Sequence, residues 1–121
     1  METENPQTEV VAIIGSRRIS FFNFDAIAGI ENIKAVISGG AYGIDTLAHN
    51  YFTERGVPVQ EIKPEYERYG SKAAPHIRNR AIIDGCSRVI AIWDGKSGGT
   101  AAAVKYARSK GKEVQVILWQ I

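Results

Sequence analysis

The sequence is poor in residues on which several classes of protein depend. Among its 121 residues there is a single cysteine, Cys86, so neither an intrachain disulfide nor a cysteine-rich metal site can form. We therefore expect a reducing, cytoplasmic setting, with no metal and no cofactor. No apolar run approaches the length of a membrane span, and residues 1–9 are polar and acidic, so we expect neither a signal peptide nor a membrane partner.

Two familiar nucleotide-binding fingerprints are also missing. The first glycine turn, Gly15-Ser16-Arg17, is not followed by the remaining glycines of G-x-G-x-x-G, and no acidic residue ends the second expected strand to bind a ribose. The P-loop pattern G-x-x-x-x-G-K-S/T occurs nowhere in the chain. We therefore expect neither a nicotinamide-dependent dehydrogenase nor a P-loop nucleotidase.

Length and composition fit one ordinary domain with a real core. The residues are 45% hydrophobic and 23% charged. We expect residues 1–8 to be a poorly ordered tail and residues 9–121 to be a single domain. The formal net charge is +2, but the first nine residues contain three glutamates and no base, so the rest of the chain carries +5. A mildly basic domain is compatible with phosphate ligands.

Five short apolar runs predict a parallel sheet. The runs are continuous rather than alternating, which is typical of strands buried on both faces. They lie at residues 10–14, 35–37, 57–62, 89–93 and 114–119. Helices are expected around residues 22–30, 44–55, 74–84 and 100–110. The fold class is therefore predicted to be α/β: a single Rossmann-like, doubly wound domain with a mainly parallel central sheet of about five strands flanked by helices.

The helix expected at residues 44–55 carries one apolar stripe, and Gly56 is expected to end it. The stripe consists of Ile44, Leu47, Ala48, Tyr51 and Phe52. In the last helix, Thr100 is expected to be the N-cap and Gly111 to stop the helix. Its narrow buried face is expected to consist of Ala101, Val104 and Ala107. Residues 64–75, with two prolines, are expected to form a long loop beside the carboxyl edge of the sheet.

Three glycine-rich turns follow predicted strands, and together they indicate a phosphate-rich ligand. The most informative is Ser38-Gly39-Gly40-Ala41-Tyr42-Gly43-Ile44-Asp45. The others are Gly15-Ser16-Arg17 and Ser97-Gly98-Gly99-Thr100. Glycines let backbone amides approach an anion, and a helix start adds unpaired N–H groups and the positive end of the macrodipole. Because doubly wound folds bind ligands at the carboxyl edge of the sheet, we expect the three turns to meet there.

Several polar residues near these turns have a functional and a plainer structural interpretation. Asp45 and His49 are four residues apart on one helical face and could pair, but we favour a capping role for Asp45 and partial burial of His49. Arg78 and Arg80 point about 200° apart on a helix, so at most one of them can face a phosphate, and a solvated basic face is the plainer interpretation. The turn that contains Asp94 combines an acid, a base, hydroxyls and glycines, which favours a ligand-binding role. The plainer interpretation is a tight turn that leads into a helix.

The motifs, taken in order, resemble the Rossmann-like core of the DNA-processing protein A (Smf) family. They are Gly15-Ser16-Arg17, the run Ser38 to Asp45 with Ala48-His49, Arg78-Asn79-Arg80 with Ile82-Ile83, and Ser97 to Thr100. The resemblance covers residues 10–118. It extends to the wider SLOG superfamily, which joins the Smf and Lonely Guy proteins and includes small stand-alone, YspA-like members.

The resemblance implies that these motifs line one anion pocket. Its expected members are Arg17, Ser38, Gly39, Gly43, Asp45, Arg78, Asn79 and the Ser97 to Thr100 turn with Gly98 and Gly99, and the glycine turns add Gly15, Ser16, Gly40 and Asp94. In the related nucleoside deoxyribosyltransferases and Lonely Guy proteins, a catalytic glutamate lies three residues past the threonine. Here that residue is Ala103, whose methyl group can neither attack an anomeric carbon nor stabilise an oxocarbenium ion.

The leading hypothesis is therefore a domain that binds or senses a nucleotide or nucleotide-derived ligand, without catalysis. The second is a single-stranded DNA-binding module like the Smf core, and the third is a nucleotide N-glycosidase or deoxyribosyltransferase-like enzyme. Self-association is left open.

Overall fold

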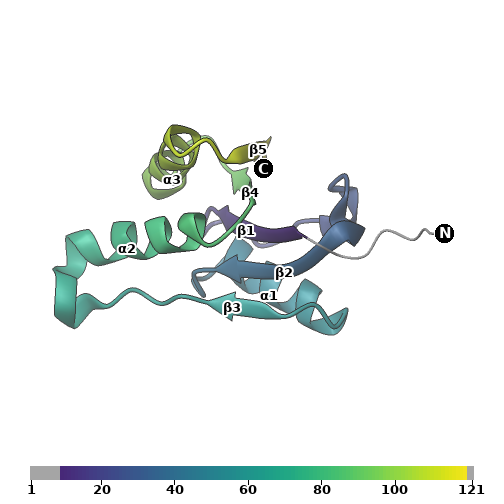
Figure 1. Ribbon diagram of the computed structural model, residues 1–121, viewed down its shortest axis with the longest axis horizontal. Coiled ribbons are helices and arrows are strands. Elements are labelled where there is room, and N and C mark those ends of the chain that lie inside the picture. Colours follow the sequence, from purple (N-terminus) through teal and green to yellow (C-terminus); the bar gives the residue numbers. More distant parts are fainter. Residues whose placement is uncertain (1–8, 120–121) are drawn as a thin grey trace.

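Five parallel strands form the centre of the protein in the computed structural model, which describes residues 9–119 (Figure 1). The strands are β1 (Glu9–Gly15), β2 (Ile33–Ser38), β3 (Val59–Glu61), β4 (Arg88–Trp93) and β5 (Glu113–Leu118). Their order across the sheet is β3-β2-β1-β4-β5, and every neighbouring pair is parallel. The chain thus winds from β1 toward one edge and then from β4 toward the other, which confirms the doubly wound α/β prediction. The predicted tail, residues 1–8, lies outside the described residues.

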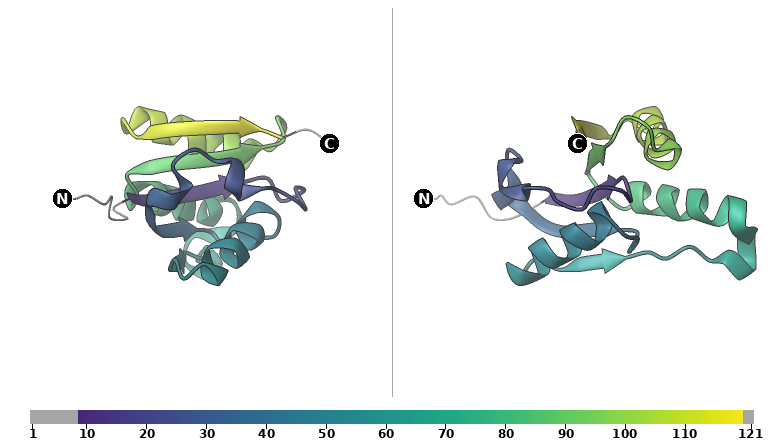
Figure 2. Two further views of the ribbon diagram at one scale, coloured as in Figure 1. Left: turned by 90° about the vertical axis from the view of Figure 1, so that its right-hand side faces the viewer. Right: turned by 180° about the vertical axis from the view of Figure 1, so that it is seen from behind.

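Helices cover both faces of this sheet (Figure 2). On one face packs α1 (Ile44–Glu54), and on the other pack α2 (Tyr66–Asp84) and α3 (Gly98–Ser109). Side chains of β1 alternate between the two cores: Val11 and Ile13 join the α1 side, and Ala12 and Ile14 join the α2 and α3 side. This alternation within a continuous apolar strand is why no polar residue interrupts the run.

The predicted helix at residues 22–30 is wrong. The chain forms two short 3₁₀ turns there, η1 (Phe24–Ala26) and η2 (Ile30–Asn32). Asn23 caps the start of η1 by accepting a hydrogen bond from the Asp25 amide, and Gly29, with a left-handed φ of 77°, precedes η2. Each turn ends after three residues because the next residue, Ile27 or Ile33, has an extended backbone. Phe24 and Ile27 are buried, and they close the core beneath α1 without needing a helix.

The predicted loop at residues 64–75 is also wrong over most of its length, because α2 begins at Tyr66. Gly70, with φ 84° and ψ 168°, interrupts the helix after its first turn. Pro75 follows near the start of the continuous part, where a proline costs at most one intrahelical hydrogen bond. The first half of α2 consequently projects beyond the carboxyl edge of the sheet (Figure 1).

The predicted C-terminal ends of α1 and α3 are correct, whereas the predicted N-cap of α3 is wrong. Gly56 and Gly111 have positive φ values directly after the C-caps of α1 and α3, as predicted. The N-cap of α3 is Ser97 rather than Thr100, and Ala101 is exposed, whereas Thr100 and Ala103 are buried with Val104 and Ala107. Among residues 9–119, no helix is long and apolar enough to cross a membrane.

Candidate functional site

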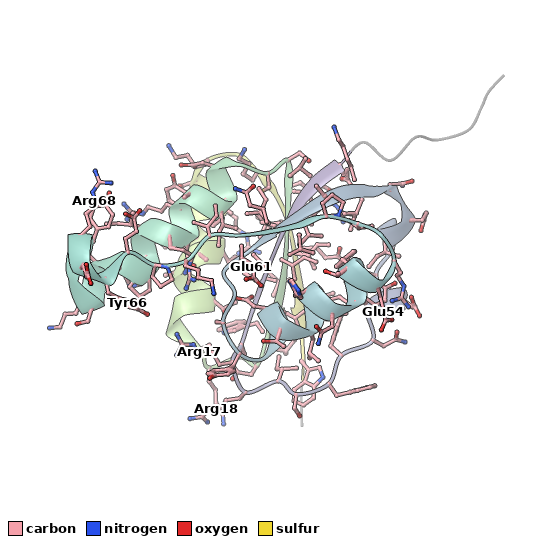
Figure 3. The ribbon with its side chains drawn as sticks, turned by 90° about the horizontal axis from the view of Figure 1, so that it is seen from below. Arg17, Arg18, Glu54, Glu61, Tyr66 and Arg68 are labelled. Carbon is pink, nitrogen blue, oxygen red and sulfur yellow. The ribbon has the colours of Figure 1, made fainter. Side chains whose placement is uncertain are left out.

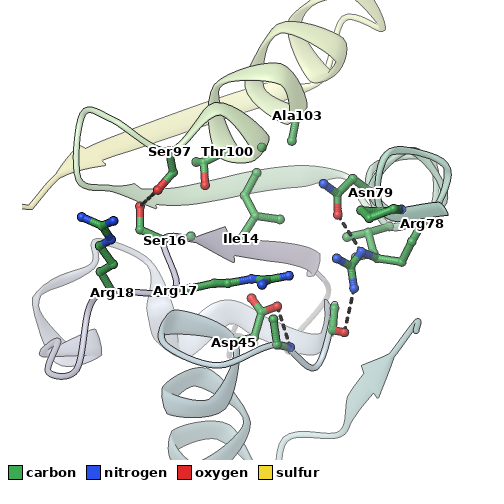
Figure 4. A pocket seen from close by; sticks show the side chains of 16 residues that line it. Ile14, Ser16, Arg17, Arg18, Asp45, Arg78, Asn79, Ser97, Thr100 and Ala103 are labelled. Carbon is green, nitrogen blue, oxygen red and sulfur yellow. Dashed lines mark hydrogen bonds between the residues drawn. The ribbon is translucent and has the colours of Figure 1, made fainter. Parts of the chain in front are cut away.

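A cavity of about 390 Å³ opens at the carboxyl edge of the sheet, where β1 and β4 lie side by side (Figure 4). Ten of the candidate residues line it: Gly15, Ser16, Arg17, Gly39, Asp45, Arg78, Asn79, Ser97, Gly99 and Thr100. Six further residues complete the lining: Ile14, Arg18, Ala41, Pro75, Ile82 and Ala103. The three glycine turns therefore meet at one cavity, as the parallel topology requires.

Ser16 ties the turns together. Its amide donates to the Ile92 carbonyl at the end of β4 (3.1 Å), and its own carbonyl accepts from the Ile44 amide at the start of α1 (3.3 Å). Its hydroxyl accepts from the Asp94 amide (3.0 Å) and is hydrogen-bonded to the Ser97 hydroxyl (3.0 Å). The side chain is 1% exposed, so Ser16 supports the walls of the cavity more than it faces a ligand.

Asp94 lies outside the lining because its carboxylate is used inside its own turn. It accepts hydrogen bonds from the Lys96 amide (2.8 Å), the Ser97 amide (2.9 Å) and the Ser97 hydroxyl. These bonds, the amide of Lys96 first, lower the pKa of Asp94 from 3.8 to about 2. Asp94 thus sets the shape of the turn that leads into α3.

The start of α3 faces the cavity with uncapped backbone. No side chain of the described residues caps the helix, and its first turn contains no acidic residue. Gly99 and Thr100 line the cavity, whereas Gly98 does not. Because the first amides of a helix have no intrahelical acceptor, this end carries free donors and a partial positive charge.

The turn after β2 depends on its glycines. Gly43 has φ 78° and ψ −130°, and a Cβ atom there would lie 2.5 Å from the Ser16 carbonyl oxygen and 2.6 Å from Arg17 Cα. A Cβ atom on Gly39 would lie 2.6 Å from Arg78 Nη1. Gly43 therefore allows two turns to touch, and Gly39 allows a guanidinium to approach the backbone. Neither Gly43, Gly40 nor Ser38 lines the cavity itself.

Ser38 is completely buried, and within the described part of the chain its hydroxyl has no hydrogen-bond partner. It lies at the end of β2, where its backbone carbonyl accepts from the Ile62 amide (2.9 Å). The side chain is therefore placed beneath the turn rather than in the cavity.

Asp45 is the one acidic residue among the described residues that line the cavity. It is 7% exposed, and its carboxylate accepts a hydrogen bond from the Ala41 amide (3.1 Å). Burial raises its pKa from 3.8 to about 6, although the Ala41 amide and the Arg78 charge oppose the shift. The N-cap of α1 is Gly43, so Asp45 lies in the first turn and does not cap the helix as we favoured.

The alternative pairing of Asp45 with His49 is not formed. His49 Nδ1 instead lies 3.3 Å from Glu61 Oε2, a carboxylate at the end of β3. His49 is not among the residues that line the cavity. Its place is therefore on the flank of α1 that faces β3.

Arg78 is fixed in the wall of the cavity. Its Nη1 donates to the Gly39 carbonyl (2.9 Å), and its Nε donates to the Asn79 side-chain oxygen (2.7 Å). Only 9% of the residue is exposed, and burial lowers its pKa, against the attraction of Asp45. Arg80 points away and lies over the Tyr106 ring, 5.3 Å from its centroid, so only one of the two arginines reaches the cavity.

Arg17 and Arg18 are different, because no carboxylate or carbonyl in the described part of the chain engages their guanidinium groups. Both side chains are exposed and line the cavity (Figure 4). Sequence reasoning missed Arg18, although its position next to Arg17 in the same turn was a usable signal. The lining thus has three arginines against one aspartate, and that aspartate is partly neutral near pH 6.

Metal binding finds no support in the described residues, which contain no group of three His, Cys, Asp or Glu side chains able to hold an ion. Comparison of the chain with protein-family models, with curated proteins and with solved structures gave no match.

Proposed function

We propose that this protein is a cytoplasmic domain that binds or senses a nucleotide or nucleotide-derived ligand, with the phosphate in the cavity at the carboxyl edge of the sheet. The observation that carries the proposal is the pair of guanidinium groups of Arg17 and Arg18, which have no carboxylate or carbonyl partner among residues 9–119, opposite the start of α3. Two arginines beside a helix N-terminus offer forked donors, full positive charge and backbone N–H groups to one anion.

The polar groups of the cavity support a phosphate ester better than a simple carboxylate ligand. The hydroxyl of Thr100 and the amide of Asn79 add neutral donors, and Ile14 and Ile82 add an apolar floor. Such a mixture suits a phosphate attached to a sugar, because the anion and the carbon skeleton both find partners. The ordered motif resemblance to the SLOG superfamily is a further reason for the proposal.

The described lining of the cavity has too few carboxyl groups for N-glycosidic catalysis, which favours binding without catalysis. Ala103 lies in the lining where related enzymes have a glutamate, and Asp94 is held inside its own turn. Glycoside cleavage generally uses two carboxyl groups, one as nucleophile or base and the other as acid. Among the described residues of this cavity, Asp45 would be the single carboxyl group for both roles. Chromatography of nucleoside monophosphates after long incubation is expected to recover intact substrate.

The test is thermal shift and calorimetry with mononucleotides, ADP-ribose and NAD-like compounds. Ligands that bind only the folded state raise its stability, and we expect at least one compound to do so. Substituting Arg17→Gln removes a charge-assisted contact and is expected to weaken that binding roughly tenfold or more. Arg68→Gln is the matched control, because Arg68 lies on the projecting turn of α2 and not in the cavity.

A single-stranded oligonucleotide serves as the competing ligand in the same assay. Binding to a polynucleotide is expected to weaken steeply as salt increases, because counterions are released from the phosphate backbone. If oligonucleotide binds in this way while every small nucleotide fails to stabilise the protein, the nucleic-acid function replaces the one proposed. If nothing in either set binds, both functions are refuted.

A further inference from the structure

A second hollow adjoins the cavity on the side of β3 and the projecting end of α2. Its volume is about 380 Å³. It shares Arg17, Gly39, Ala41 and Arg78 with the first cavity, so the two hollows meet at a pair of arginines. Its remaining walls include Tyr42, Lys63, Pro64 and Tyr66. None of these four side chains lines the first cavity.

The two tyrosines of this hollow differ from the rest. Tyr51 and Tyr106 donate their hydroxyls to Asp25 and Asp84, and Tyr69 lies under the Arg68 guanidinium. Tyr42 is 82% exposed and Tyr66 is 50% exposed, and within residues 9–119 neither makes a hydrogen bond or a ring contact. Figure 3 shows Tyr66 on the first turn of α2 and Arg17 on the turn after β1, the two elements that flank the hollow.

The backbone that carries Tyr42 is nevertheless held in place. The Ala41 amide donates to Asp45, and the Ala41 carbonyl accepts from the Thr46 hydroxyl (2.9 Å). Gly40 and Gly43 on either side have positive φ values that set the path of the turn. An aromatic side chain is therefore presented by an ordered loop, and little conformational entropy is lost when a ring stacks on it.

We infer that the second hollow binds an aromatic base carried by the phosphorylated ligand, with Tyr42 and Tyr66 as the stacking residues. The inference rests on the proposed function, because the phosphate places the ligand at Arg17 and Arg78. Exposed aromatic faces bind nucleobases through stacking, which every base can provide. The two tyrosines and the three cationic side chains of the lining favour a flat, electron-rich ring over a second sugar. The ligand class is thus a nucleotide with its base attached, and not a sugar phosphate.

Calorimetry with the full chain tests this inference with AMP, GMP, CMP and UMP on one side and ribose 5-phosphate on the other. At least one of the four nucleotides is expected to bind more tightly than ribose 5-phosphate. Tyr42→Ala and Tyr66→Ala are each expected to weaken binding of that nucleotide by roughly five- to a hundredfold, the range for loss of a stacking ring. Binding of ribose 5-phosphate is expected to stay unchanged.

Three controls accompany these variants. Tyr42→Phe and Tyr66→Phe keep the ring and are expected to retain nucleotide affinity, which separates stacking from a hydroxyl contact. Tyr69→Ala removes a tyrosine from the same projecting turn that does not line the hollow, and it is expected to have no effect.

The outcomes separate the two proposals. If ribose 5-phosphate binds and the nucleotides bind no better, or if the alanine variants leave nucleotide binding unchanged, the base site is refuted while the phosphate site stands. Equal weakening of nucleotide and ribose 5-phosphate by the alanine variants also refutes it, since the tyrosines would then act on the phosphate site. If none of these compounds binds the unmodified protein, the base site is refuted, and the proposed function then depends on the ADP-ribose and NAD-like compounds of its own panel.

Discussion

Replacing Asp45 with asparagine is expected to stabilise the protein at neutral pH. The carboxyl group is buried, and its pKa rises from 3.8 to about 6 on folding. A raised carboxyl pKa means that the folded state binds more protons than the unfolded state between pH 4 and pH 6, so the free energy of unfolding falls as pH rises through this window. Above pH 6 the full cost of holding a buried carboxylate is present.

The magnitude follows from the difference between the two pKa values of Asp45. A difference of about 2 between these pKa values, at about 1.36 kcal/mol per pKa unit, corresponds to about 3 kcal/mol at pH 7.5. At pH 4 the carboxyl is almost fully protonated in the folded state, whereas more than half of it is ionised in the unfolded state, so the same linkage leaves less than about 1 kcal/mol. Asparagine keeps an oxygen that can accept from the Ala41 amide, so the variant removes the charge and retains the hydrogen bond.

Urea unfolding of Asp45→Asn and the unmodified protein, at pH 4, 5, 6 and 7.5, measures this difference directly. Subtracting the two curves cancels other titrating groups. Glu54→Gln is the control, because its side chain is 80% exposed and the change is expected to be less than about 0.5 kcal/mol at every pH. A difference for Asp45→Asn that is independent of pH, or a loss of stability at pH 7.5, would refute the reasoning.

Substitutions at three positions of the site, one of them with a matched control, test its construction by urea unfolding at pH 7.5. Gly43→Ala is expected to cost several kcal/mol, because its Cβ would meet the Ser16 carbonyl at 2.5 Å, whereas Gly70→Ala, with positive φ but open space, should cost about 1–3 kcal/mol from backbone strain alone; equal losses would contradict the clash. Arg78→Lys is expected to cost about 1–3 kcal/mol, because the bond to Gly39 or to Asn79 must be lost, and an unchanged midpoint would contradict this. Ser38→Ala is expected to be neutral or to stabilise by about 1 kcal/mol, since its buried hydroxyl has no described partner; a loss above that size would indicate a partner.

The parallel sheet could be predicted because its central strands are apolar on both faces. β1 and β4 contribute alternate residues to two cores, and this arrangement leaves a continuous apolar run in the sequence. The meeting of the three turns then followed from topology, since parallel strands place all their carboxyl ends at one edge. Most of the residues that line the cavity could therefore be predicted from the sequence.

The errors arose where local signals compete with packing. Gly70 and Pro75 predicted a loop, yet the chain bends at the glycine and continues as helix on both sides. A helix was expected at residues 22–30, but the chain forms two short turns there, and Phe24 and Ile27 still fill the core. Asp94 looked like a ligand contact, because composition cannot show that its carboxylate is satisfied by amides two and three residues ahead. Hydrogen bonding and packing determine these features, and neither sequence periodicity nor residue type reveals them.

The bonds of Ser16 restrict how this architecture can change during evolution. Loops at the carboxyl edge of α/β domains ordinarily vary in length independently of one another. Here one serine holds the end of β4, the start of α1 and the turn before α3, so an insertion in any of these connections would displace the other two. New ligand preferences must therefore arise by exchange of side chains at the rim, such as Arg18 and Tyr42, while the lengths of the three turns stay constant.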